Sequence, residues 1–184
     1  MRYLAAMMIS LALGLLASGP AQAQSYKFST TINAPGVKIA GVTVKASDKV
    51  AGENERWGPQ DVAYLEKDLR KRVVQRLQAK QLMTDGKGAR LELTIVDVTP
   101  NRPTLQAMTK RQGLDFRSFG LGGAEIAAHL ISADGKDLGQ MQYRWYEQQL
   151  YEFSDSKTIW FDARRAFGRF ARRLSRELQN QPEA

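Results

Sequence analysis

The sequence lacks cysteine altogether and contains a single histidine, His129, among its 184 residues. Without thiols the chain can form no disulfide, hold no cysteine-ligated zinc or iron–sulfur cluster, and carry out no thiol catalysis. One histidine is also too few for a typical metal site, which needs two or three such ligands at defined spacing. We therefore predict no metal and no cofactor, and interpret His129 as an ordinary strand residue.

Acidic residues are comparatively scarce. Aspartate and glutamate together number 19 against 27 lysines and arginines, which gives a formal net charge of +8. A chain with this excess of exposed positive charge attracts anionic partners. The composition therefore favours lipid headgroups, lipopolysaccharide or an acidic protein surface as the partner.

The only long apolar run lies at the N-terminus, from Leu4 to Ala17. Arg2 precedes it, and Ala21-Gln22-Ala23 has the small-x-small pattern that a signal peptidase cleaves. The run is shorter than the roughly 20 residues that a membrane-spanning helix needs. We predict a signal peptide over residues 1–23, cleaved between Ala23 and Gln24. The mature protein is then periplasmic, with secretion as the alternative, and has no transmembrane segment.

The mature chain, residues 24–184, is expected to form a single α+β domain. Alternating apolar residues predict strands, and spacings of three and four predict helices that begin near Pro59 and Ile159. The expected strands are 26–32, 37–45, 89–98, 121–132 and 138–153. This order favours two layers, with two amphipathic helices on one face of a mostly antiparallel sheet of about four to five strands. Residues 99–120 have no clear period and are expected to form a long loop.

A glycine cluster in the stretch Arg117–Glu125, RSFGLGGAE, raises the question of a phosphate-binding loop. Such loops have either Gly-x-Gly-x-x-Gly spacing or a Gly-Lys-Ser/Thr ending, and a helix follows them. This stretch has neither spacing, and the pattern after it predicts a strand. We interpret the glycines as residues that let the chain enter the sheet or approach another backbone closely.

No catalytic constellation stands out in the sequence. There is no Gly-x-Ser-x-Gly nucleophile elbow. Asp97, Asp115 and Glu125 could converge as paired carboxylates, which leaves a small hydrolase as the third and weakest alternative. The expectation is that the protein is not an enzyme.

The last predicted helix is the most unusual stretch, because it is rich in arginine and has few acidic residues to balance them. Its arginines are Arg164, Arg165, Arg169, Arg172, Arg173 and Arg176. Two interpretations stay open: a solvated helix face, or a surface that docks on an anionic partner. Arg102, Arg111 and Arg117 add positive charge in the predicted loop. Arginines interleaved with aromatic residues also suit single-stranded nucleic acid, but export argues against that partner.

Three runs resemble a family of small bacterial envelope proteins, periplasmic proteins and lipoproteins, that is known only as a domain of unknown function. They are ARLELTIVDVTP (89–100), SFGLGGAEIAAHLISADGKDLGQ (118–140) and TIWFDARRAFGRFARRL (158–174). The resemblance implies an α+β domain akin to envelope accessory lipoproteins, with no known catalytic residues. This chain departs from many of those relatives in lacking the lipid-bearing cysteine.

The leading hypothesis is a non-catalytic, exported accessory or binding protein of the bacterial cell envelope. Its partner would be another envelope protein or an anionic envelope surface. The alternative is an electrostatic binder of lipid headgroups or lipopolysaccharide that uses the arginine-rich C-terminal helix. The sequence does not settle the oligomeric state.

Overall fold

The computed structural model describes residues 26–53, 55–149 and 158–179. In these ranges five strands form one open sheet in the order β1-β5-β4-β3-β2. The strands are β1 (Tyr26–Thr30), β2 (Ile39–Ala46), β3 (Ala89–Thr99), β4 (Gly123–Ile131) and β5 (Asp137–Tyr146). The helices are α1 (Asp48–Ala51), α2 (Pro59–Ala79), α3 (Leu105–Lys110) and α4 (Phe161–Gln179). Neighbouring strands run antiparallel, apart from the parallel pair β2 and β3. The predicted α+β class is confirmed.

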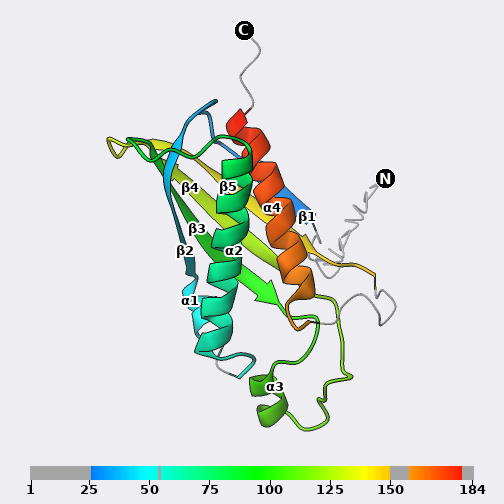
Figure 1. Cartoon of the computed structure of the whole chain (residues 1–184). Helices are drawn as coiled ribbons and strands as arrows, with labels where there is room; N and C mark the ends of the chain where they lie inside the picture. The colour runs from blue at the N-terminus through cyan, green and yellow to red at the C-terminus, as the bar shows by residue number, and fades with distance from the viewer. Residues whose placement is uncertain (1–25, 54, 150–157, 180–184) are drawn as a thin grey trace, which may run out of the picture.

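The two long helices, α2 and α4, lie side by side on one face of the sheet (Figure 1). Proline at the first position of α2 leaves no backbone N–H unsatisfied there. Leu65, Leu69, Val73 and Leu77 recur every four residues and form the buried side of this helix. The two-layer arrangement predicted from the sequence is therefore present.

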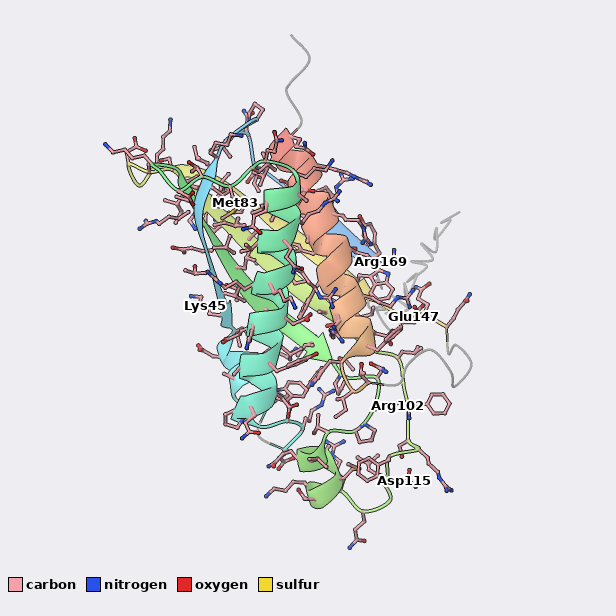
Figure 2. All side chains as sticks on the ribbon, in the orientation of Figure 1. Lys45, Met83, Arg102, Asp115, Glu147 and Arg169 are labelled. Carbon is pink, nitrogen blue, oxygen red and sulfur yellow. The ribbon has the colours of Figure 1, made fainter. Side chains whose placement is uncertain are left out.

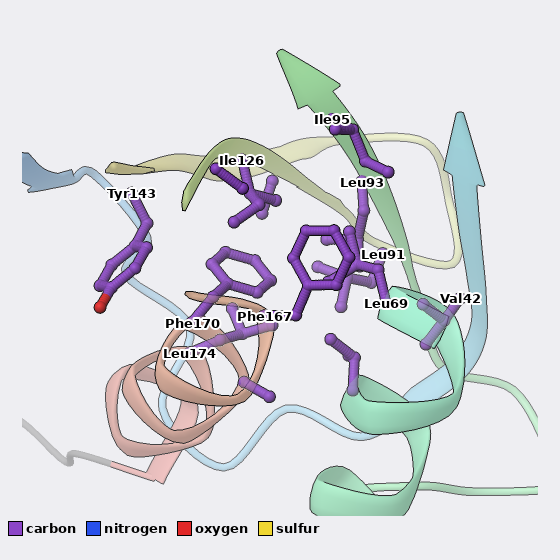
Figure 3. Packing of buried hydrophobic residues seen from close by; sticks show 14 of the residues in the cluster. Val42, Leu69, Leu91, Leu93, Ile95, Ile126, Tyr143, Phe167, Phe170 and Leu174 are labelled. Carbon is purple, nitrogen blue, oxygen red and sulfur yellow. The ribbon is translucent and has the colours of Figure 1, made fainter. Parts of the chain in front are cut away.

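The core lies between the helices and the sheet (Figure 3). Phe167 and Phe170 project from α4 and are fully buried. They meet the inward side chains of the strands, of which Leu91, Leu93 and Ile95 alternate along β3 with exposed or half-buried residues. The alternation seen in the sequence thus reflects a sheet with one covered face.

The glycine cluster does bring two backbones together, as interpreted. A Cβ atom on Gly123 would lie 2.4 Å from the carbonyl oxygen of Trp145 in β5. One on Gly122 would lie 2.9 Å from the carbonyl oxygen of Thr99. Gly120, by contrast, has open space around its missing Cβ. A strand, β4, begins at Gly123, so the N-terminal helix turn of a phosphate-binding loop is not found here.

The predicted loop 99–120 is shorter than expected and contains a short helix. Strand β3 continues to Thr99, and the segment includes the six-residue helix α3. Thr104 caps that helix by accepting a hydrogen bond from the Ala107 N–H at 3.1 Å. A helix of fewer than two turns is too short to produce a hydrophobic period, which is why the pattern did not reveal it.

Two other predictions fall partly or wholly outside the described residues. The strand expected over 138–153 ends at Tyr146, and residues 150–157 are not described. The signal peptide 1–23 and its cleavage site also lie outside them and stay predictions. Across the ranges that the structure does describe, none of the helices combines the length and the apolar character that crossing a bilayer requires.

Candidate anion-binding surfaces

Residues 100–121, here called the α3 segment, combine exposed apolar side chains with positive charge. Leu105 is 68% exposed and Phe116 is 73% exposed, and Phe119 and Leu121 are also exposed. The cations of the segment are Arg102, Lys110, Arg111 and Arg117. Its one acidic residue is Asp115. The segment extends beyond the ends of the two long helices (Figures 1 and 2).

The α3 segment is fixed to the domain through buried polar contacts at its start. Asn101 is 1% exposed, and its side-chain N–H donates to the Thr158 carbonyl at 3.1 Å. The Asn101 side-chain oxygen accepts from the Asp162 N–H at 3.3 Å. The Thr104 hydroxyl donates to the Arg56 carbonyl. These bonds hold the segment between the N-terminal ends of α2 and α4.

Local hydrogen bonds also shape the tip of the segment. The Asp115 carboxylate accepts from the backbone N–H groups of Arg117, at 2.7 Å, and Ser118, at 3.0 Å. Arg102 donates to the Phe116 carbonyl at 3.0 Å. Between the tip and the body lies a pocket of about 200 Å³, lined mainly by carbon atoms. The exposed phenyl ring of Phe116 therefore sits on a defined turn.

The six arginines of α4 fall into two groups. Three make ion pairs: Arg164 with Asp68 at 3.4 Å, Arg165 with Glu147 at 2.7 Å, and Arg173 with Glu177 at 3.0 Å. The others, Arg169, Arg172 and Arg176, are exposed and make no ion pair with any described residue. The predicted arginine surface is thus partly neutralised by α2 and by the end of β5.

A groove with a volume of about 380 Å³ lies between α2 and α4. We call it the arginine groove. It is lined by Arg72 of α2 and by Phe161, Arg164, Arg165, Gly168, Arg169 and Arg172. Figure 2 shows Arg169 on α4, away from the α3 segment that carries Arg102. The predicted arginines therefore form two separate surfaces. Arg72 was missed because the sequence showed only its i,i+4 pairing with Asp68 along α2.

The three candidate carboxylates do not form one site. Asp97 and Glu125 are paired across β3 and β4, whereas Asp115 lies in the turn of the α3 segment. Asp97 accepts a hydrogen bond from the Tyr146 hydroxyl at 2.8 Å and pairs with Lys49 at 3.0 Å. Burial, with the nearby Asp97 charge, raises the pKa of Tyr146 well above its usual value. Glu125 lies 3.6 Å from Arg144, so both strand carboxylates already have partners.

His129 lies in β4. Its Nε2 atom lies 3.2 Å from a carboxylate oxygen of Asp137 on the neighbouring strand. Within the described ranges no three residues among histidines, aspartates and glutamates are grouped so that they could hold a metal ion.

Asp162 is a buried carboxylate of α4 that hydrogen-bonds to the backbone just before β4. It is 5% exposed, accepts from the Gly122 N–H at 3.2 Å and lies 3.8 Å from Arg165. Burial raises its pKa above the ordinary 3.8, and the hydrogen bond from Gly122 partly opposes that shift. The folded state therefore favours the protonated carboxyl more than the unfolded chain does.

Replacing Asp162 with asparagine should make stability less dependent on pH. A carboxyl whose pKa is higher in the folded state than in the unfolded chain stabilises the fold. That stabilisation is complete at a pH below the unfolded pKa and is lost as pH rises through the folded pKa. The amide keeps an oxygen for the Gly122 N–H but carries no charge. Urea unfolding at about pH 4 and about pH 7 measures this. The free energy of unfolding of the parent should fall relative to that of D162N as pH rises. A constant difference between the two proteins would contradict the assignment.

Comparison with known proteins gives distant similarities. No protein-family model matches the chain, and no curated protein matches it. A crystal structure of an uncharacterised protein is similar over 79% of this chain and 94% of its own, with 12% identity and a TM-score of 0.45. A minor lipoprotein from Acinetobacter baumannii is similar over 76% and 91%, with 12% identity and a TM-score of 0.32. At that distance the two likenesses carry no argument about family or function.

Proposed function

We propose that the protein is a non-catalytic accessory protein of the bacterial cell envelope that docks on an anionic lipid surface through the α3 segment. The observation that carries the proposal is the exposed apolar and cationic surface of that segment. It would act in the periplasm after export, as the N-terminal signal predicts. The arginine-rich helix was the first candidate for this role, but half of its arginines are already in ion pairs.

The distribution of exposed apolar side chains supports this choice of surface. Six large apolar side chains are exposed in the described residues, and four of them belong to the α3 segment. Scattered exposed apolar residues need no explanation, but a cluster marks an interaction surface. The hydrogen bonds around Asp115 fix the turn that carries Phe116, so the cluster is prepared before binding.

The charges around the cluster favour an anionic bilayer as the occupant. Four cations and one carboxylate surround the apolar side chains, and the carboxylate of Asp115 is used by the turn itself. At a membrane interface, aromatic and leucine side chains enter the headgroup region while arginines meet the lipid phosphates. Each basic residue near such a surface contributes about 1 kcal/mol of attraction, which salt weakens.

Removing two exposed cations from the α3 segment should weaken vesicle binding strongly. We expect R111Q/R117Q to lower the affinity for anionic vesicles about 30-fold at low salt, because two basic residues contribute roughly 2 kcal/mol together. Co-sedimentation of the chain from residue 24 onward with anionic and neutral vesicles measures this. Binding by the parent should also fall steeply between low and high salt.

The matched control removes the same charge from the exposed side of α2. Lys67 and Lys71 are both exposed and lie outside the α3 segment, so K67Q/K71Q should bind within about twofold of the parent. A third variant, F116A, should lose binding while keeping the net charge. Equal losses in the two charge variants would show that net charge alone drives binding and would overturn the role of the segment. Absence of vesicle binding by the parent would leave an acidic protein surface as the partner.

A further inference from the structure

We infer that the arginine groove is a binding site for a phosphate group. The inference goes beyond the proposed membrane docking, since it concerns a different surface and a specific ligand chemistry. The groove lies between α2 and α4, and the described residues that line it are five arginines, one phenylalanine and one glycine, with no carboxylate among them. An anionic ligand is complementary to this positively charged groove.

The carboxylates around the groove neutralise only part of its positive charge. Asp68 is shared between Arg72, at 2.5 Å, and Arg164, at 3.4 Å. Arg165 pairs with Glu147 at 2.7 Å and lies 3.8 Å from Asp162. Arg169 and Arg172 make no ion pair with any described residue. Guanidinium groups repel one another at close range, so a bound anion relieves a repulsion that the fold itself leaves in place.

Gly168 forms an open floor on which two guanidinium groups converge. Terminal nitrogens of Arg72 and Arg172 each lie 3.8 Å from the position that a Cβ atom of residue 168 would occupy. The two nitrogens are therefore no more than twice that distance apart, a span that one phosphate can bridge. A Cβ atom at this position would make only ordinary contacts, so the floor can take one methyl group without being closed.

Two of the groove arginines, Arg72 and Arg169, are held in place before any ligand arrives. Arg76 of α2 donates to the Ser175 hydroxyl of α4 at 3.1 Å, which ties the two helices together. Asp68 holds the Nε side of Arg72, and Arg169 stacks on the ring of Trp145 at 4.7 Å. Arginines fixed in this way lose less side-chain freedom on binding than free ones.

Guanidinium geometry points to phosphate rather than to a simple halide. Arginine presents planar pairs of N–H donors, which suit the oxygens of a phosphate, and charge-assisted bonds of this kind are the strong ones. The groove is open and larger than one phosphate, so the phosphate can belong to a larger molecule. A phosphomonoester on a lipid headgroup and one on a soluble molecule share this chemistry.

The experiment measures binding of inorganic phosphate and of glycerol phosphate by calorimetry, at constant low ionic strength, with the chain from residue 24 onward. We expect R172Q to lower both affinities about tenfold or more, because it removes a charge-assisted hydrogen bond. R176Q is the control: Arg176 lies one turn further along α4, is exposed and does not line the groove. It should change the affinity less than about twofold.

A second pair of variants, at Gly168, distinguishes the effect of a negative charge on phosphate binding from the effect of a larger side chain. G168E places a carboxylate on the floor of the groove and should abolish binding. G168A adds one methyl at ordinary contact distance and should bind like the parent, with circular dichroism confirming that both variants fold. Equal losses in R172Q and R176Q, or no phosphate binding by the folded parent, would overturn the site.

Vesicles containing phosphatidic acid identify the source of the phosphate and keep the two proposals apart. A loss of vesicle binding in R172Q beyond that in R176Q would place a lipid phosphomonoester in the groove. Unchanged vesicle binding with lost glycerol phosphate binding would assign the groove to a soluble phosphoester. R111Q/R117Q should keep its affinity for glycerol phosphate, so a failure of membrane docking does not count against the groove.

Discussion

Replacing Gly123 with alanine is expected to lower the free energy of unfolding by about 3 kcal/mol, at the upper end of the cost of overpacking. The added Cβ would lie 2.4 Å from the Trp145 carbonyl oxygen and 2.5 Å from the Tyr146 Cα. These are backbone atoms of the paired strand, where Gly123 lies opposite Tyr146 in the register. A flexible side chain could turn away, but here β4 or β5 itself must shift.

Gly120 provides the matched control, because it belongs to the same glycine cluster and has nothing within 4 Å of its missing Cβ. G120A should change the free energy of unfolding by no more than about 0.5 kcal/mol, as for an ordinary surface substitution. Urea unfolding followed by circular dichroism measures both variants. Equal stability of G123A and G120A would refute the interpretation of the cluster as a site of close backbone approach.

The fold was largely predictable because its layers leave periodic traces in the sequence. Ile126, Ala128 and Leu130 alternate along β4 since one face of the sheet is covered. The four-residue recurrence in α2 follows from its single buried side. The parallel pairing of β2 with β3 was not predictable, because strand order depends on contacts between distant segments that no local period records.

The candidate sites were harder to predict because they depend on tertiary contacts. From the sequence, the α4 arginines were predicted to form one surface. In the structure, Arg164 pairs with Asp68 of α2 and Arg165 pairs with Glu147, which follows β5. Arg72 of α2 lines the same groove as Arg172 of α4, although the two residues are about a hundred positions apart in the sequence. Which charges stay available therefore follows from how the helices pack.

The second large effect is expected at Phe170. Replacing it with alanine should lower the free energy of unfolding by about 4 kcal/mol, through lost burial and the cavity left behind. The ring is fully buried between α4 and the sheet, and its centroid lies 6.1 Å from that of Tyr143 at an interplanar angle of 63° (Figure 3). Edge-to-face contacts of this kind add to the burial itself.

A loss of that size is a large part of the stability of a typical domain, so F170A can fail to fold. F170L keeps the prediction testable, because it retains most of the buried volume and should cost less than about 1.5 kcal/mol. F116A is the surface control: that ring is 73% exposed, so its removal should change stability by less than about 0.5 kcal/mol. The urea midpoint should be lowest for F170A, higher for F170L and highest for F116A. This order would place Phe170 in the core and keep Phe116 in the proposed membrane-docking surface. A cost for F116A as large as that for F170L would instead assign Phe116 to packing and remove it from that surface.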